Sequence, residues 1–103
     1  MRGLTILVVS GDPARFEAAL TLASASAALG ARSRVYCHGG AVARLAADSP
    51  LLATAREIGV ALIACQTGLS DTGLSFDALA PGVEAGGMVG VLADLRDDRL
   101  VTI

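Results

Sequence analysis

The sequence contains no lysine and no tryptophan, and it has only two phenylalanines, one tyrosine and one histidine in 103 residues. Without lysine there is no G-x-x-x-x-G-K-[ST] phosphate loop, which excludes a Walker-type NTPase. All eight basic residues are arginines, they are spread singly, and the formal net charge is -2. Since the chain offers neither a basic stripe nor an aromatic platform on which bases would stack, we expect no nucleic-acid partner.

Cysteine is scarce as well, because Cys37 and Cys65 are the only two. They allow at most one disulfide, and neither has a neighbour at zinc-ligand spacing, so we expect no metal site. A reducing compartment is the simpler interpretation. The first apolar run, residues 4–9, is too short for a signal-peptide core or a membrane span. We therefore expect a soluble cytoplasmic protein without a membrane partner.

Apolar residues are what the chain has in excess. They make up 53% of the sequence, and the mean hydropathy is +0.63. A chain of 103 residues forms one domain, residues 1–103, that is large enough to bury a core without disulfide or metal links. The surplus favours burial against copies of the same chain, although an alanine-rich parallel sheet covered on both faces also has this composition. We expect a homo-oligomer.

Apolar runs alternate with helical patterns along the chain, which predicts repeated βα units. The fold class expected is α/β, a three-layer α/β/α sandwich with a mostly parallel five-stranded sheet. Strands are predicted at residues 4–9, 34–38, 60–64, 83–85 and 100–103. Helices are predicted at residues 13–29, 50–58, 74–79 and 88–95, with a shorter helical turn at 41–47. Gly30 and Gly59 stand where a helix ends and a strand begins.

The turn after the first predicted strand is Ser10-Gly11-Asp12. Asp12 is a good N-cap for a helix that has Pro13 at its first position. Ser10 could bind an anion at the start of that helix. The Asp12 carboxylate argues against this, because it would occupy the free amides and repel phosphate.

Cys65 follows the third predicted strand and precedes a polar, glycine-bearing run at residues 66–73. In open α/β proteins the carboxyl end of a strand faces the crevice in which ligands bind. A helix that begins soon afterwards would favour the thiolate form. Free cysteine is also among the most buried residue types and often acts only as a small hydrophobe. Position alone leaves both interpretations open.

His38 and Cys37 end the second predicted strand and reach the same sheet edge as Cys65. His38 could lower the thiol pKa by pairing with Cys65, or it is an ordinary loop histidine. Side chains alternate along a strand, so Cys37 should face the opposite way from His38. Core packing is its best explanation, and a resolving thiol for Cys65 is the alternative.

Six short segments, taken in order and spacing, resemble the DsrE/DsrF-like (YchN-like) sulfur-relay family over nearly the whole chain. They are ILVVSG at 6–11, AALG at 27–30, AREIGV at 55–60, ACQTGL at 64–69, PGVE at 81–84 and GM at 87–88. The resemblance implies a parallel five-stranded α/β/α fold and assembly into homo- or hetero-oligomers, often trimers or hexamers. It also implies a cysteine that carries sulfane sulfur as a persulfide, without a cofactor.

By motif match the persulfide-bearing cysteine is Cys65. The function expected from the resemblance is that of a sulfur carrier, similar to a sulfurtransferase, which takes sulfur from a donor protein and passes it to a partner thiol. Gln66 and Thr67 would stabilise the persulfide through their backbone amides. Gly68, Ser10 and His38 are the further candidate binding residues. The alternative is a non-catalytic oligomeric or small-ligand-binding module of the same fold.

Overall fold

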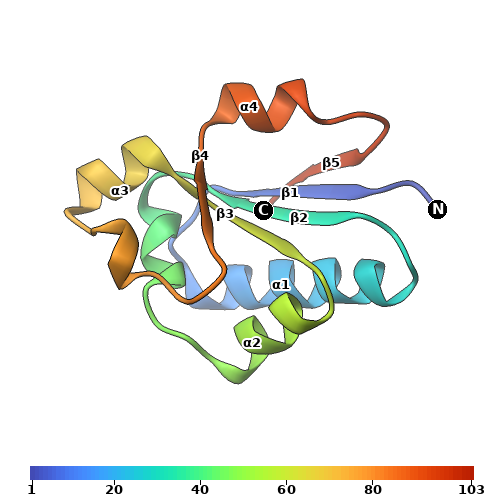
Figure 1. The fold of residues 1–103 in the computed structure, drawn as a ribbon, viewed down its shortest axis with the longest axis horizontal. Helices are drawn as coiled ribbons and strands as arrows, with labels where there is room; N and C mark the ends of the chain where they lie inside the picture. The colour runs from blue at the N-terminus through green and yellow to red at the C-terminus, as the bar shows by residue number, and fades with distance from the viewer.

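A single sheet of five strands forms the centre of the computed structural model, which describes residues 1–103 (Figure 1). The strands are β1 Leu4–Val8, β2 Ser33–Cys37, β3 Ala61–Cys65, β4 Glu84–Gly86 and β5 Arg99–Thr102. Their order is β4-β3-β2-β1-β5, and every neighbouring pair is parallel. The expected α/β fold is confirmed, and the sheet is wholly parallel.

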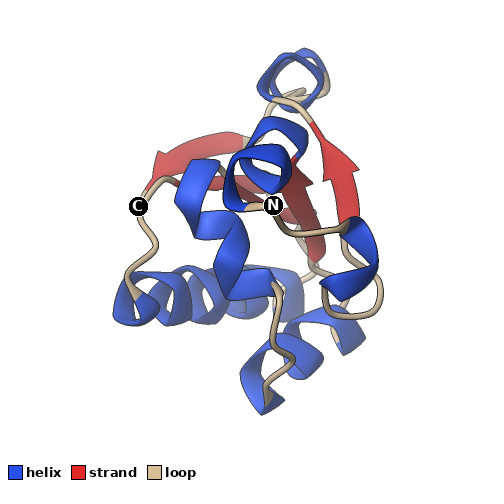
Figure 2. Ribbon diagram, turned by 90° about the vertical axis from the view of Figure 1, so that its left-hand side faces the viewer, coloured by secondary structure: helices blue, strands red, loops and turns tan.

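Helices cover both faces of this sheet. The helices α1 Pro13–Ala28 and α2 Pro50–Glu57 lie on one face, and α4 Met88–Ala93 lies over the other (Figure 1). Figure 2 shows the strands between these layers. At the carboxyl end of the strands, α3 Gln66–Thr72 packs against the 3₁₀ helix η1 Gly39–Leu45. A second 3₁₀ turn, η2 Phe76–Ala78, follows α3.

The two long helices begin and end where their capping residues predict. The Asp12 carboxylate accepts a hydrogen bond from the Arg15 amide at 3.0 Å, and the Ser49 hydroxyl accepts one from the Leu52 amide at 3.1 Å. Each cap precedes a proline at the first helical position. Gly30 and Gly59 follow the helix ends with φ of 92° and 98°, a conformation that favours glycine.

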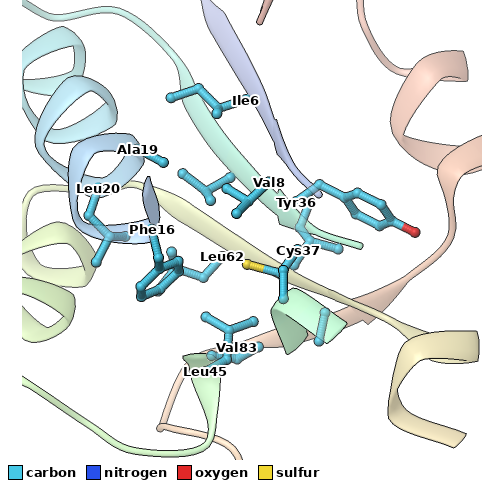
Figure 3. Close-up of a cluster of buried hydrophobic side chains, with 14 of the residues drawn as sticks. Ile6, Val8, Phe16, Ala19, Leu20, Tyr36, Cys37, Leu45, Leu62 and Val83 are labelled. Atoms are coloured by element: carbon cyan, nitrogen blue, oxygen red, sulfur yellow. The ribbon is translucent and has the colours of Figure 1, made fainter. Parts of the chain in front are cut away.

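The main core lies between the sheet and α1. Phe16 and Leu20 of α1 pack toward Val8, Cys37 and Leu62 of the three central strands (Figure 3). Both β1 and β2 are buried along their whole length, as expected for central strands of a parallel sheet covered on two faces. The apolar residues of these two strands are therefore explained by the fold of one chain.

On the opposite face, a buried arginine connects the central strands to α4 and to the residue that precedes β5. Arg34 of β2 donates from Nε to the Thr5 hydroxyl and from Nη2 to the Val91 carbonyl, both at 3.0 Å. The Thr5 hydroxyl donates in turn to the buried Asp98 carboxylate at 2.8 Å. Since a buried charge is costly without partners, these contacts make Arg34 tolerable and fix the position of α4.

The prediction was wrong in the segment after β3. Residues 66–73, expected to be loop, form α3, and the helix expected at 74–79 is reduced to η2. The sequence of α3, QTGLSDT, is rich in weak helix formers, and its N-cap is a cysteine rather than a residue of the usual capping set. Tertiary packing on η1 overrides these local preferences. No helix of the chain combines the length and apolar character needed to cross a membrane.

We expect Leu20→Ala to lower the free energy of unfolding by about 2–5 kcal/mol, because Leu20 is 1% exposed in the α1 core and its truncation leaves a cavity. Leu22→Ala on the same helix is the matched control, since Leu22 is 43% exposed; its expected cost is about 0.5 kcal/mol or less. Urea unfolding measures both. Equal losses of stability in the two variants would contradict the assignment of Leu20 to the core.

Candidate functional site

Cys65 is both the last residue of β3 and the N-cap of α3. The Gly68 amide donates to its sulfur at 3.3 Å, in the way that an amide at this position donates to the side chain of a Ser or Asp cap. A capping side chain must be an acceptor, and a thiolate is a better acceptor than a thiol. The start of α3 therefore favours the ionised form of Cys65.

A second segment approaches the sulfur from the turn after β2. Gly39 has φ of +57°, and its amide lowers the pKa of Cys65. The turn lies so close to α3 that a Cβ on Gly68 would be 2.7 Å from the Gly39 carbonyl oxygen. Gly68 is therefore needed for close approach of two backbone segments, a role that its position in the sequence motif does not reveal.

Tyr36 of β2 supplies the side-chain partner of Cys65. In the β2–β3 register Cys37 lies opposite Ala64, so Tyr36 and Cys65 share the other face of the sheet. The Tyr36 ring is 1% exposed and points away from α1 (Figure 3). Interaction with its hydroxyl lowers the pKa of the Cys65 thiol. Tyr36 is not among the site residues expected from the sequence, although side chains two residues apart on a strand share a face, and Tyr36 precedes His38 by two.

These donors change the acidity of the site. Burial disfavours the charged thiolate, but the hydrogen bonds from Tyr36 and from the amides of Gly68, Gly39 and Thr67 outweigh it, and the Cys65 pKa falls to about 7. The pKa of Tyr36 is raised by burial and by its interaction with Cys65. Near pH 7, roughly half of Cys65 is the nucleophilic thiolate.

Cys37 has the opposite character. It is fully buried, and its sulfur points into the α1 core (Figure 3). Burial raises its pKa to about 12. Because Cys37 and Cys65 lie on opposite faces of the sheet, the alternative that Cys37 is a resolving thiol is wrong, and core packing explains it.

The other predicted site residues differ in whether they interact with Cys65. His38 is exposed and stacks on Tyr36 with ring centroids 6.3 Å apart, and no hydrogen bond joins it to Cys65. Gln66 and Thr67 are exposed; the Thr67 amide reaches the sulfur, whereas that of Gln66 does not. Ser10 accepts from the Asp12 amide at 3.1 Å and has no contact with Cys65.

No group of His, Cys, Asp and Glu side chains is arranged to hold a metal ion. The chemistry available to this site is that of the Cys65 thiolate, which neighbouring donor groups stabilise. Cys65 itself is only 5% exposed, so only a small part of the residue is accessible to reagents in solution.

Comparison with solved structures identifies the fold. The chain aligns over its full length with all of the YchN protein from E. coli, with a TM-score of 0.83 and 23% identity. It also aligns over full length with a protein of unknown function from Methanobacterium thermoautotrophicum, with a TM-score of 0.82 and 20% identity. A conserved protein of unknown function from Bacteroides thetaiotaomicron gives 0.75 and 19% identity, over 98% of this chain and 94% of that one.

No protein-family model matches the chain, and no curated protein sequence matches it. At the identities found, the structural similarity establishes a YchN-like fold, as the sequence resemblance implied, and leaves the activity to the geometry around Cys65.

We expect Tyr36→Phe to raise the Cys65 pKa from about 7 toward the ordinary value of 9.0, because the variant keeps the ring and loses the donor. The readout is the alkylation rate against pH in a Cys37→Ser background, where the rate follows the thiolate fraction. The control is His38→Ala, which removes the stacked ring and no donor. An unchanged midpoint in Tyr36→Phe, or an equal shift in His38→Ala, would contradict this role.

We expect Gly68→Ala to destabilise the fold by about 1–3 kcal/mol and to slow alkylation of Cys65 at pH 7, because the new methyl group would push the Gly39 turn away from α3. Gly90→Ala is a matched control at the same position of α4, where a Cβ meets open space. It should stabilise the fold by up to about 1 kcal/mol through helix propensity. Thermal unfolding measures the stability of both variants. A stability change of the same sign in Gly68→Ala and Gly90→Ala would contradict the role of Gly68.

Proposed function

We propose that this chain, which has the YchN-like fold, is a sulfane-sulfur carrier that holds the transferred sulfur on Cys65 as a persulfide. The observation that carries the proposal is the set of donors around one sulfur. The Gly68 amide in the first turn of α3 donates to the sulfur at 3.3 Å, and Tyr36 and Gly39 at the end of β2 also favour the thiolate of Cys65. A cysteine used only for packing has no need of such donors, as Cys37 illustrates.

The chemistry needs only the thiolate and a donor persulfide, R–S–SH. The Cys65 thiolate attacks the outer sulfur, a new S–S bond forms, and the donor S–S bond breaks to release R–S⁻. In the second step an acceptor thiolate attacks the outer sulfur of Cys65–S–SH and regenerates the Cys65 thiolate. Atoms and electrons balance in both steps without a cofactor.

The hydrogen-bond donors support both steps. They favour the attacking thiolate in the first step and the departing thiolate in the second. The amides of Gly68, Gly39 and Thr67 take the role expected for Gln66 and Thr67.

Exposed apolar side chains support a homo-oligomer or a docked partner, as the composition suggested. Val9 is 50% exposed directly after β1, and Phe76 is 48% exposed in η2 after α3. Both belong to segments that follow strands or helices at the Cys65 end of the molecule. Burial of these side chains by another subunit would explain their exposure in the single chain.

A non-catalytic module is the second candidate, and one observation favours it. Cys65 is nearly buried, caps α3, and lines none of the three cavities at residues 13–51, 1–101 and 34–94, so its role would be to fix the start of a helix. Serine is a strong capping residue and would replace cysteine in that role. The two candidates therefore differ in sulfur chemistry and not in stability.

The test is intact-protein mass spectrometry after incubation with inorganic polysulfide. We expect wild-type protein and Cys37→Ser to gain one sulfur atom that a reductant removes. Cys65→Ser should gain none and should unfold at nearly the wild-type denaturant concentration, because serine keeps the cap. Absence of loading in the wild type, or loading that depends equally on both cysteines, would reject the carrier and leave the structural role.

A further inference from the structure

A groove separate from the Cys65 site lies between α1, the end of η1 and the start of α2. Its volume is about 430 Å³, in the lower range of cavities that hold small molecules. Phe16, Leu20 and Leu51 provide apolar walls. The groove is on the α1 face of the sheet, whereas the Cys65 side chain is on the face of Tyr36, whose ring points away from α1 in Figure 3.

Arg44 of η1 lines this groove and has no protein acceptor. It is partly buried, its Nε is fully buried without a hydrogen bond, and no carboxylate lies within ion-pair distance of its guanidinium. The other arginines either have an acceptor or are exposed. Those with an acceptor are Arg2, Arg32, Arg34, Arg56 and Arg96, and the exposed ones are Arg15 and Arg99.

The buried Nε of Arg44 costs free energy, because this donor has lost water and has no acceptor within the chain. The guanidinium as a whole is a planar fork of donors. A planar carboxylate is the group that satisfies such a fork, with two parallel hydrogen bonds. Arg44 thus has the chemistry of a ligand-binding arginine, and the apolar walls next to it would receive the remainder of the ligand.

The acidic residues of the groove limit the charge of the ligand. Asp48 is neutralised by Arg56, which donates to its two carboxylate oxygens at 3.0 and 3.1 Å. Glu17 is exposed and has no cationic partner, so one negative charge remains at the rim. It repels a second negative charge on a ligand, and therefore disfavours phosphate and dicarboxylates.

We propose that this groove is a binding site for a small monocarboxylic acid with a branched or aromatic apolar body, held by Arg44 and by the walls of α1 and α2. The site is independent of sulfur transfer, since none of its lining residues contacts Cys65.

The test is a titration of the ¹⁵N-labelled full chain with 4-methylpentanoate, followed by amide chemical shifts. We expect saturable shifts confined to α1, η1 and α2, with a dissociation constant on the order of 1 mM for so small a probe. The uncharged 4-methylpentan-1-ol should bind at least tenfold more weakly. Cys65→Ser should bind as the wild type does, which separates this result from the fate of the sulfur-carrier proposal.

Two variants test the groove by different means. Arg44→Gln should weaken binding about tenfold or more by removing the charge, while Arg15→Gln, which alters an exposed α1 arginine outside the groove, should leave it unchanged. Ala47→Leu should weaken binding by filling the groove with Arg44 intact. Absence of saturable shifts, shifts outside the groove, or equal affinity in Arg44→Gln and the wild type would overturn the proposal.

Discussion

The contact between the backbone at Gly39 and the backbone at Gly68 is the constraint on which the site depends. It brings the turn after β2 against the first turn of α3, and it is possible only because position 68 has no Cβ. Two consequences follow from this single approach. The α3 segment is helical despite poor local propensity, and amides from two segments converge on the Cys65 sulfur. A side chain at position 68 would disturb both.

The parallel sheet brings the residues on either side of that contact close to the Cys65 sulfur. In parallel register the strands end at the same edge, so the end of β2 delivers Gly39 and the end of β3 delivers Cys65 to neighbouring places. Strand alternation then divides the two thiols between the faces. Cys37 enters the α1 core with a pKa of about 12, and Cys65 meets the Tyr36 hydroxyl with a pKa of about 7. Identical side chains thus acquire different reactivity from their positions in one sheet.

The two faces of the sheet also place two arginines, Arg34 and Arg44, in different environments that the sequence does not distinguish. Arg34 is buried beneath α4, and it donates to the Thr5 hydroxyl and to the Val91 carbonyl of that helix. Arg44 is partly buried beside α1 in a groove of apolar walls, and its Nε has no acceptor. The hydrogen bonds of Arg34 give it a structural role, and the unpaired Nε of Arg44 is one basis of the ligand site that we propose. This difference is invisible in a sequence where arginines are spread singly.

Local patterns are enough to predict the strands, the two longest helices and their caps, because apolar periodicity and capping residues such as Asp12 and Ser49 act over a few neighbouring positions. The position of Cys65 at the carboxyl edge of the sheet is also predictable, since it follows from chain order in βα units. Three features could not be predicted in this way: the helical state of α3, the interaction of Cys65 with Tyr36 in place of His38, and the effect of the Gly39 amide on Cys65. These depend on contacts between segments about 30 residues apart, whose energies no local pattern encodes.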